Sequence, residues 1–117
     1  MPKTWLFVLS LTTVSLTALV TYFLNSSLSN KSVSKNEIDT AVNQAKFLYS
    51  QEKERGRDFS QGPCLSEALM PNWVADIAHN PRQSIDDLPQ NQCLSYREGR
   101  VQHFVELDSE GNLIRAQ

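Results

Sequence analysis

An N-terminal run of this chain, from Thr4 to Asn30, contains no charged side chain. Within it, residues 5–24 read WLFVLSLTTVSLTALVTYFL and are apolar or aromatic except for Ser and Thr. Twenty helical residues span about 30 Å, which is the thickness of the hydrocarbon core of a bilayer. The sequence therefore predicts a membrane anchor or signal segment over residues 1–24, which contacts the membrane through residues 5–24.

The length of this run favours a retained anchor over a cleaved signal peptide, whose apolar core spans only about 7 to 15 residues. We expect a single-pass protein with its N-terminus inside and residues 31–117 outside the cytoplasm. The alternative is a secreted or periplasmic protein after cleavage of the segment. Thr13, Thr17 and Thr21 form a small-residue stripe on one helix face, so self-association of the membrane helix is a less favoured expectation.

A linker and a helix follow the apolar run. Residues 25–34, NSSLSNKSVS, have the composition of a short polar linker. Ser34 and Glu37 have the spacing of a capping box, and Gly56 is a typical stop. The sequence predicts an amphipathic helix over residues 35–55, which packs against the remainder of a small domain over residues 35–117. Its apolar stripe has a helical period and consists of Ile38, Ala41, Val42, Ala45, Leu48 and Tyr49.

Residues 62–92 are rich in proline and predict little regular structure. Residues 66–70 favour one or two helical turns that Pro71 ends. Residues 72–79 fit a helix face and a strand face equally, and the bracketing Pro71 and Pro81 favour a short helix. Residues 80–92 predict a loop, with a single helical turn at residues 84–87.

From Cys93 onward the apolar residues recur with period two, which predicts three short strands: CLSYR, RVQHFVELD and LIRA. We expect the face with His103 and Val105 to be buried and the face with Phe104 and Glu106 to be exposed. The predicted fold class is α+β: an N-terminal transmembrane helix, an amphipathic helix, a disulfide-tied loop-rich insert and a three-stranded antiparallel β-meander.

Cys64 and Cys93 are the only two cysteines and flank the proline-rich insert. A disulfide between them would close a loop of about 30 residues and stabilise the domain by about 3–4 kcal/mol. Two cysteines in an oxidising compartment usually form such a bridge. The less favoured alternative is a small Cys–His hydrolase, in which Cys64 is the nucleophile and His103 the base.

A second group of residues predicts a surface for a ligand or a protein partner. Trp73, Asp76, His79 and Arg82 could line a pocket for an acidic or sugar-like ligand. The alternative is that Asp76 and Arg82 pair locally and His79 ends a short helix. Two histidines without metal-ligand spacing predict no metal, and no glycine-rich loop indicates a phosphate cofactor. The net charge of −2 predicts no nucleic-acid partner.

The segments GPCLSEALMPNWVADIAHNPRQ, LPQNQCLSYREG and HFVELDSEGNLIRA resemble a family of short uncharacterised bacterial proteins with an N-terminal hydrophobic segment. The resemblance covers about half of the chain. It implies bacterial export or anchoring and carries no activity. We therefore expect a membrane-tethered, extracytoplasmic and non-enzymatic domain that binds a protein or an envelope component. A pilin-like assembly subunit is the further alternative, beside the Cys–His hydrolase.

Overall fold

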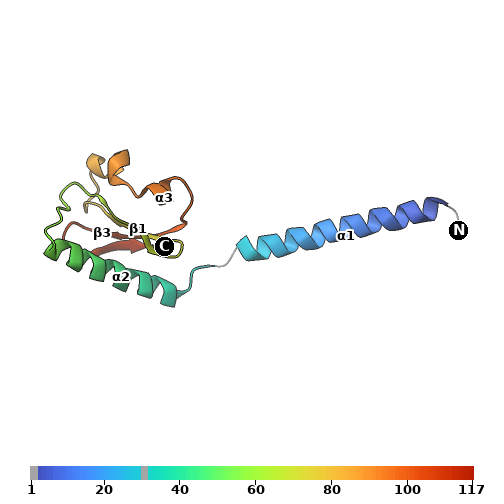
Figure 1. The fold of residues 1–117 in the computed structure, drawn as a ribbon, viewed down its shortest axis with the longest axis horizontal. Coiled ribbons are helices and arrows are strands. Elements are labelled where there is room, and N and C mark those ends of the chain that lie inside the picture. Colours follow the sequence, from blue (N-terminus) through green and yellow to red (C-terminus); the bar gives the residue numbers. More distant parts are fainter. Residues whose placement is uncertain (1–2, 30–31) are drawn as a thin grey trace. The chain divides into compact units, whose positions relative to one another are not determined.

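The computed structural model describes residues 3–29 and 32–117, which belong to two compact units, Met1–Ser32 and Val33–Gln117. The first unit contains the helix α1 (Lys3–Ser29), drawn in blue in Figure 1. The second unit contains α2, a four-stranded sheet, two 3-10 helices and the short helix α3. It is an α+β domain.

In α1, the hydroxyl side chains bond to the helix itself. Thr13, Thr17 and Thr21 each donate to a carbonyl one turn earlier, at distances between 2.8 and 3.1 Å. This pattern satisfies the hydroxyls of the predicted stripe within their own helix. α1 also continues through residues 25–29 of the predicted polar linker, and residues 30–31 lie outside the described part of the chain.

The prediction of a transmembrane helix is wrong for the part of the chain that the structure describes. Within residues 3–29 and 32–117, no helix combines the length and the apolar character that crossing a membrane requires. Between Val8 and Tyr22, six side chains of α1 are those of Ser or Thr, which lowers the apolar character of the helix. The predicted single-pass topology is therefore not supported.

α2 (Lys35–Glu54) confirms the predicted amphipathic helix. The side-chain oxygen of Ser34 accepts a hydrogen bond from the Glu37 amide at 3.2 Å, as the capping pattern predicts. The Glu37 carboxylate accepts instead from Nε1 of Trp73 at 2.9 Å, and this bond ties the first turn of α2 to the sheet. The buried residues on the apolar stripe of α2 are Ala41, Ala45 and Tyr49.

Residues 64–77 form a β-hairpin where the sequence predicts helical turns. β1 (Cys64–Met70) pairs antiparallel with β2 (Trp73–Ile77), and Met70 lies opposite Trp73. Pro71 and Asn72 make the connection. Asn72 has a φ of 65°, the positive value that a type II turn places after its proline. The predicted helical turns at 66–70 and helix at 72–79 are both wrong, because strand pairing overrides the helix propensity of SEALM.

The sheet has the strand order β1-β2-β3-β4 and is mixed, not a three-stranded antiparallel meander. β3 (His103–Leu107) is parallel to β2, and β4 (Leu113–Ala116) is antiparallel to β3. A parallel pair needs a crossover of a dozen or more residues. The predicted strands at β3 and β4 are confirmed.

The crossover consists of residues 78–102 and contains three short helical segments: η1 (Ser84–Asp87), η2 (Pro89–Asn91) and α3 (Leu94–Arg97). η1 confirms the predicted helical turn at residues 84–87. The predicted strand CLSYR is wrong, because Cys93 caps the N-terminus of α3. Figure 1 shows α2 on one side of the sheet and the crossover on the other.

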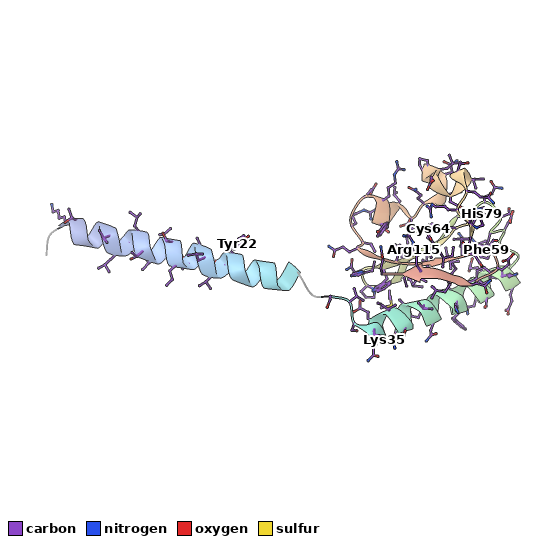
Figure 2. All side chains as sticks on the ribbon, turned by 180° about the vertical axis from the view of Figure 1, so that it is seen from behind. Tyr22, Lys35, Phe59, Cys64, His79 and Arg115 are labelled. Carbon is purple, nitrogen blue, oxygen red and sulfur yellow. A yellow bond between two sulfur atoms is a disulfide. The ribbon has the colours of Figure 1, made fainter. Side chains whose placement is uncertain are left out.

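Covering the sheet on both sides buries both faces of its central strands. The α2 side carries the larger cluster, in which Trp73, Val105 and Leu107 are fully buried. On the crossover side, Val74, Cys93 and Phe104 form a second cluster. The prediction of an exposed face at β3 is therefore wrong: Phe104 and Glu106 are only 7% and 6% exposed. Side chains project from both faces of the sheet in Figure 2.

Candidate functional site

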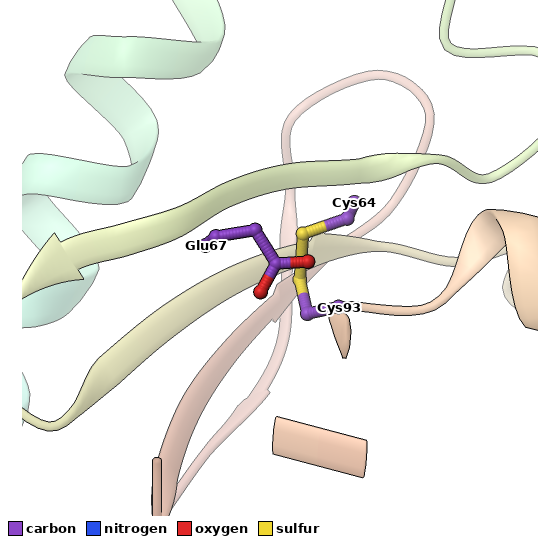
Figure 3. A group of neighbouring side chains, drawn as sticks. All are labelled: Cys64, Glu67 and Cys93. Atoms are coloured by element: carbon purple, nitrogen blue, oxygen red, sulfur yellow. A yellow bond between two sulfur atoms is a disulfide. The ribbon is translucent and has the colours of Figure 1, made fainter. Parts of the chain in front are cut away.

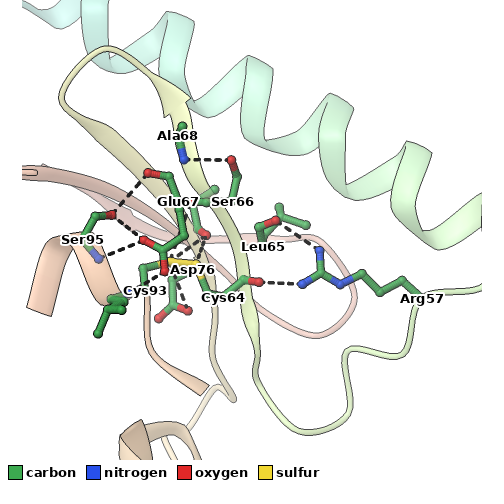
Figure 4. Close-up of a disulfide and its surroundings, with 11 residues drawn as sticks. Arg57, Cys64, Leu65, Ser66, Glu67, Ala68, Asp76, Cys93 and Ser95 are labelled. Carbon is green, nitrogen blue, oxygen red and sulfur yellow. Dashed lines mark hydrogen bonds between the residues drawn. A yellow bond between two sulfur atoms is a disulfide. The ribbon is translucent and has the colours of Figure 1, made fainter. Parts of the chain in front are cut away.

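The predicted disulfide between Cys64 and Cys93 is present, with an S–S distance of 2.05 Å and a Cα–Cα distance of 4.9 Å. It joins the first residue of β1 to the residue that precedes α3, as Figure 4 shows. The two sulfur atoms contact the carbonyl oxygen of Ala75 at 3.6 and 3.2 Å. The bridge therefore holds the end of the crossover against the sheet.

Glu67 lies beside the disulfide (Figure 3) and could be taken for part of a metal site, since its oxygen and the two sulfur atoms lie within 4.8 Å of one another. The sulfur atoms, however, are bonded to each other. The Glu67 carboxylate accepts from the amides of Leu94 and Ser95 at 2.6 and 2.9 Å, and from the Ser95 hydroxyl. Burial alone would raise the pKa of Glu67, but these hydrogen bonds lower it. Glu67 thus caps α3.

The two residues of the alternative catalytic pair lie apart. Cys64 is opposite Asp76 near one end of β2, and His103 is opposite Trp73 at its other end. The His103 ring packs against the Trp73 ring with centroids 5.0 Å apart, on the α2 side of the sheet. Cys64 packs on the crossover side and has no free thiol in the disulfide. The oxidised protein therefore offers no Cys–His nucleophile.

A cleft of about 350 Å³ lies on the crossover side of the sheet. Its size falls in the range of small-molecule sites in proteins. Residues from the sheet form its floor, and residues from the crossover form its walls. The floor residues are Val74, Asp76, Phe104, Glu106, Arg115 and Gln117, and the wall residues are Arg82, Gln92, Cys93, Tyr96 and Arg97.

Strand register explains why the charged floor residues lie side by side. Asp76 on β2 is opposite Glu106 on β3, and Glu106 is opposite Arg115 on β4. Residues opposite each other on neighbouring strands project from the same face. The three side chains therefore form a cross-strand row of acid, acid and base; we call this the charged row.

Glu106 at the centre of the charged row is paired on both sides. It accepts from Nη1 of Arg82 at 3.0 Å and from Nε of Arg115 at 3.3 Å, and its side chain is 8% exposed. Arg82 also pairs with the more exposed Asp87 at 3.0 Å. A carboxylate so deeply buried requires such partners, because an unpaired buried charge strongly destabilises the fold.

Asp76 has a very different environment in the same row. Burial and the neighbouring negative charge of Glu106 raise the pKa of Asp76 to about 8, although Arg82 acts in the opposite direction. At neutral pH the Asp76 carboxyl is therefore mainly protonated and can donate a hydrogen bond. A neutral acid next to an ionised carboxylate in a cleft is the kind of perturbed group that marks candidate functional sites.

The loop that carries Arg82 to the cleft is held by Asp86, which is 1% exposed. Its carboxylate accepts from the amides of His79 and Gln83 at 3.0 and 2.9 Å, and lies 2.8 Å from Nδ1 of His79. Burial would raise the pKa of Asp86, but these hydrogen bonds lower it. Gly62, with a φ of 66°, lies against Asp86, where a Cβ would clash with the carboxylate. Asp86 therefore positions the loop from inside.

The structure divides the four residues of the predicted ligand surface. Asp76 and Arg82 both line the cleft. Trp73 is fully buried on the α2 side, and His79 is bound to Asp86 outside the cleft. Arg82 pairs with Glu106 and Asp87, so the predicted local pair with Asp76 is replaced by a longer-range one.

Sequence reasoning missed most of the cleft. Phe104 and Glu106 were expected on an exposed face, and Arg97 and Arg115 were not singled out. One signal was present: a phenylalanine in the middle of a supposed solvent face, with polar residues on both sides, indicates that the face is covered.

Together, the fold and the cleft define a small disulfide-tied α+β domain with a polar cleft between sheet and crossover. No protein-family model matches the chain, and no similar curated protein or solved structure is found at a significant level.

Proposed function

We propose that residues 33–117 form a non-enzymatic binding domain that works in an oxidising compartment outside the cytoplasm. The observation that carries the proposal is the cleft between sheet and crossover, in which a protonated carboxyl, a buried ion pair and arginine side chains meet over apolar side chains. A concave site with a few convergent polar groups and a perturbed carboxyl is the usual form of a ligand site.

The disulfide supports the proposed location in an oxidising compartment. Disulfides persist in secreted, periplasmic and cell-surface proteins and are rare where thiols are kept reduced. In this domain the bridge lines the cleft through Cys93 and fixes the wall that bears Tyr96 and Arg97. The candidate site therefore depends on an oxidised pair of cysteines.

A fragment screen by NMR tests the binding function. The full chain, with the disulfide intact, is titrated with mixtures of small acids, amines, sugars and neutral aromatics. We expect chemical-shift changes that cluster at the cleft, around Val74, Phe104 and Arg115, for at least one fragment class.

A matched pair of variants makes the screen decisive. Gln92 lines the cleft, and Gln90 is exposed outside it. Gln92→Trp should fill the cleft and abolish the shifts, whereas Gln90→Trp should leave them unchanged. If no fragment class gives shifts at the cleft, or if Gln92→Trp binds as the unaltered protein does, the proposed function is wrong.

A further inference from the structure

The distribution of hydrogen-bond donors in the cleft indicates what it binds. Arg97 lines the cleft from α3, and within residues 3–29 and 32–117 its side chain has no hydrogen bond or ion pair. Arg115 bonds to Glu106 only through Nε, at 3.3 Å, so its two terminal nitrogens have no acceptor in the described part of the chain. Two arginine side chains from different elements thus present unused donors to the same cleft.

The acids of the cleft do not use these donors. Glu106 is occupied by Arg82 on one side and by Nε of Arg115 on the other. Asp76 is mainly protonated at neutral pH, because burial and the charge of Glu106 raise its pKa to about 8. Three arginine side chains line the cleft, and the ionised side-chain carboxylates beside them are those of Glu106 and, at the rim, Asp87. These side chains together carry an excess of one positive charge. A cleft of this kind attracts an anion.

The uncharged part of the cleft specifies the rest of the ligand. The Phe104 ring meets the Tyr96 ring edge-on, with centroids 5.1 Å apart, and the Arg115 guanidinium lies 5.0 Å from the Phe104 ring centre. Val74 and Cys93 complete the apolar lining. These groups suit a flat or aliphatic body better than a strongly hydrated ion.

From this arrangement we propose that the cleft binds an organic carboxylate whose apolar body lies over Phe104 and Tyr96 and whose carboxylate is held by Arg97 and Arg115. A planar guanidinium offers paired N–H donors that match the two oxygens of a carboxylate. The inference rests on the proposed binding function and names its ligand class. The carboxylate could belong to a free organic acid or to the C-terminal residue of a peptide, since both present the same group.

Calorimetric titration of the full chain at pH 6.5 tests the ligand class. The probes are phenylacetate and its neutral counterpart phenylacetamide, together with a short peptide ending in Phe, as free acid and as amide. We expect phenylacetate to bind and phenylacetamide to bind at least roughly tenfold more weakly, since hydrogen bonds to a charged group are lost. Binding of the free-acid peptide as well would identify C-terminal residues as a source; binding of phenylacetate alone would restrict the site to free acids.

Variants locate the carboxylate. Arg97→Gln should weaken phenylacetate binding roughly ten- to hundredfold without loss of folding, because the Arg97 side chain has no partner to leave behind. Arg115→Lys keeps the charge and loses the fork, and should also weaken binding. Arg100→Gln is the control, since Arg100 pairs with Glu98 and does not line the cleft.

Three results would overturn the carboxylate inference: equal affinity for phenylacetate and phenylacetamide, an equal loss in Arg100→Gln, or no binding of any acid probe. If amines, sugars or neutral aromatics bind in the fragment screen while the acids do not, the ligand class is wrong and the binding function stands. If no fragment class binds at the cleft, both are wrong.

Discussion

The two faces of the sheet differ in almost every respect. On the α2 side, Trp73, Ala75, Ile77, Val105 and Leu107 form one buried cluster with the apolar residues of a regular helix. On the crossover side, a disulfide, the charged row and two arginine side chains with free donors surround an open cleft. One face is closed by apolar burial, whereas the other is held by a covalent bond and ion pairs and keeps a site accessible.

The difference indicates a division of roles within about 85 residues. A domain of this size buries only a modest share of its surface, so the closed face must supply most of the hydrophobic stabilisation. The open face can then retain buried charges and a cleft, because the disulfide limits how far the crossover can move. If this division holds, substitutions on the two faces should differ in their effect on stability.

The largest effect is expected on the closed face. Trp73→Ala removes a fully buried indole and the hydrogen bond to Glu37, and should lower the free energy of unfolding by about 3–5 kcal/mol. The control is Tyr96→Ala in the cleft wall, where the ring is 41% exposed and the loss should be much smaller. Urea unfolding followed by circular dichroism measures both. Equal losses would contradict the division between the faces.

Removing the disulfide should have the second-largest effect. The double variant Cys64→Ser, Cys93→Ser opens a loop with a sequence separation of 29 and should lose about 3–4 kcal/mol. Hydrogen exchange should show more opening in α3 and the crossover than in α2. Reductant should destabilise the unaltered protein and leave the double variant unchanged. Uniform opening of α2 and α3 would show that the bridge does not act on the crossover alone.

The third prediction concerns pH and Asp76. Because the folded pKa is about 8, above the ordinary value of 3.8, the folded state binds an extra proton between these values. The Asp76 contribution to stability is therefore fully present below about pH 3.8 and is lost as the pH rises through about 8. Asp76→Asn should flatten this part of the stability–pH profile. At pH 8 its free energy of unfolding should exceed that of the unaltered protein by at least about 1 kcal/mol, the equivalent of one pKa unit.

Denaturant midpoints measured from pH 4 to pH 9 check this expectation. Asp39→Asn, on the exposed side of α2, controls for the change in net charge. If the denaturant midpoint of Asp76→Asn depended on pH as steeply as that of the unaltered protein, Asp76 would be ionised in the folded state at neutral pH.

The smallest effect is expected at the start of α2. Ser34→Ala removes the cap on the Glu37 amide and should lower stability by about 1 kcal/mol. Ser50→Ala is the matched control, since Ser50 bonds back to the Lys46 carbonyl within the exposed helix and alanine favours helix there. Thermal unfolding measures both. A larger loss in the control than in Ser34→Ala would leave the capping explanation without support.

Several elements were predictable because their signals are local. Ser34, the apolar stripe and the stop at Gly56 lie within one helix, and α2 was found within a residue of its ends. The disulfide followed from there being only two cysteines. β3 and β4 showed a period of two over a few residues, and both are strands.

The errors arose where one segment is covered on both sides. β2 has Trp73, Ala75 and Ile77 toward α2, with Val74 and Asp76 toward the crossover, so its burial shows no alternation to identify a strand. β1 carries helix-favouring residues and depends on its partner for its conformation. The Pro71-Asn72 turn signal was in the sequence, and proline was interpreted as the end of a helix instead.

The amphipathic helix, the sulfur bridge and the two last strands could be predicted from the sequence, because each depends on neighbouring residues or on the one pair that two cysteines can form. The parallel pairing of β2 with β3, and the row of Asp76, Glu106 and Arg115, arise only in the folded domain. Strand register is set by contacts between segments far apart in the chain, and the pattern of any one strand does not contain them.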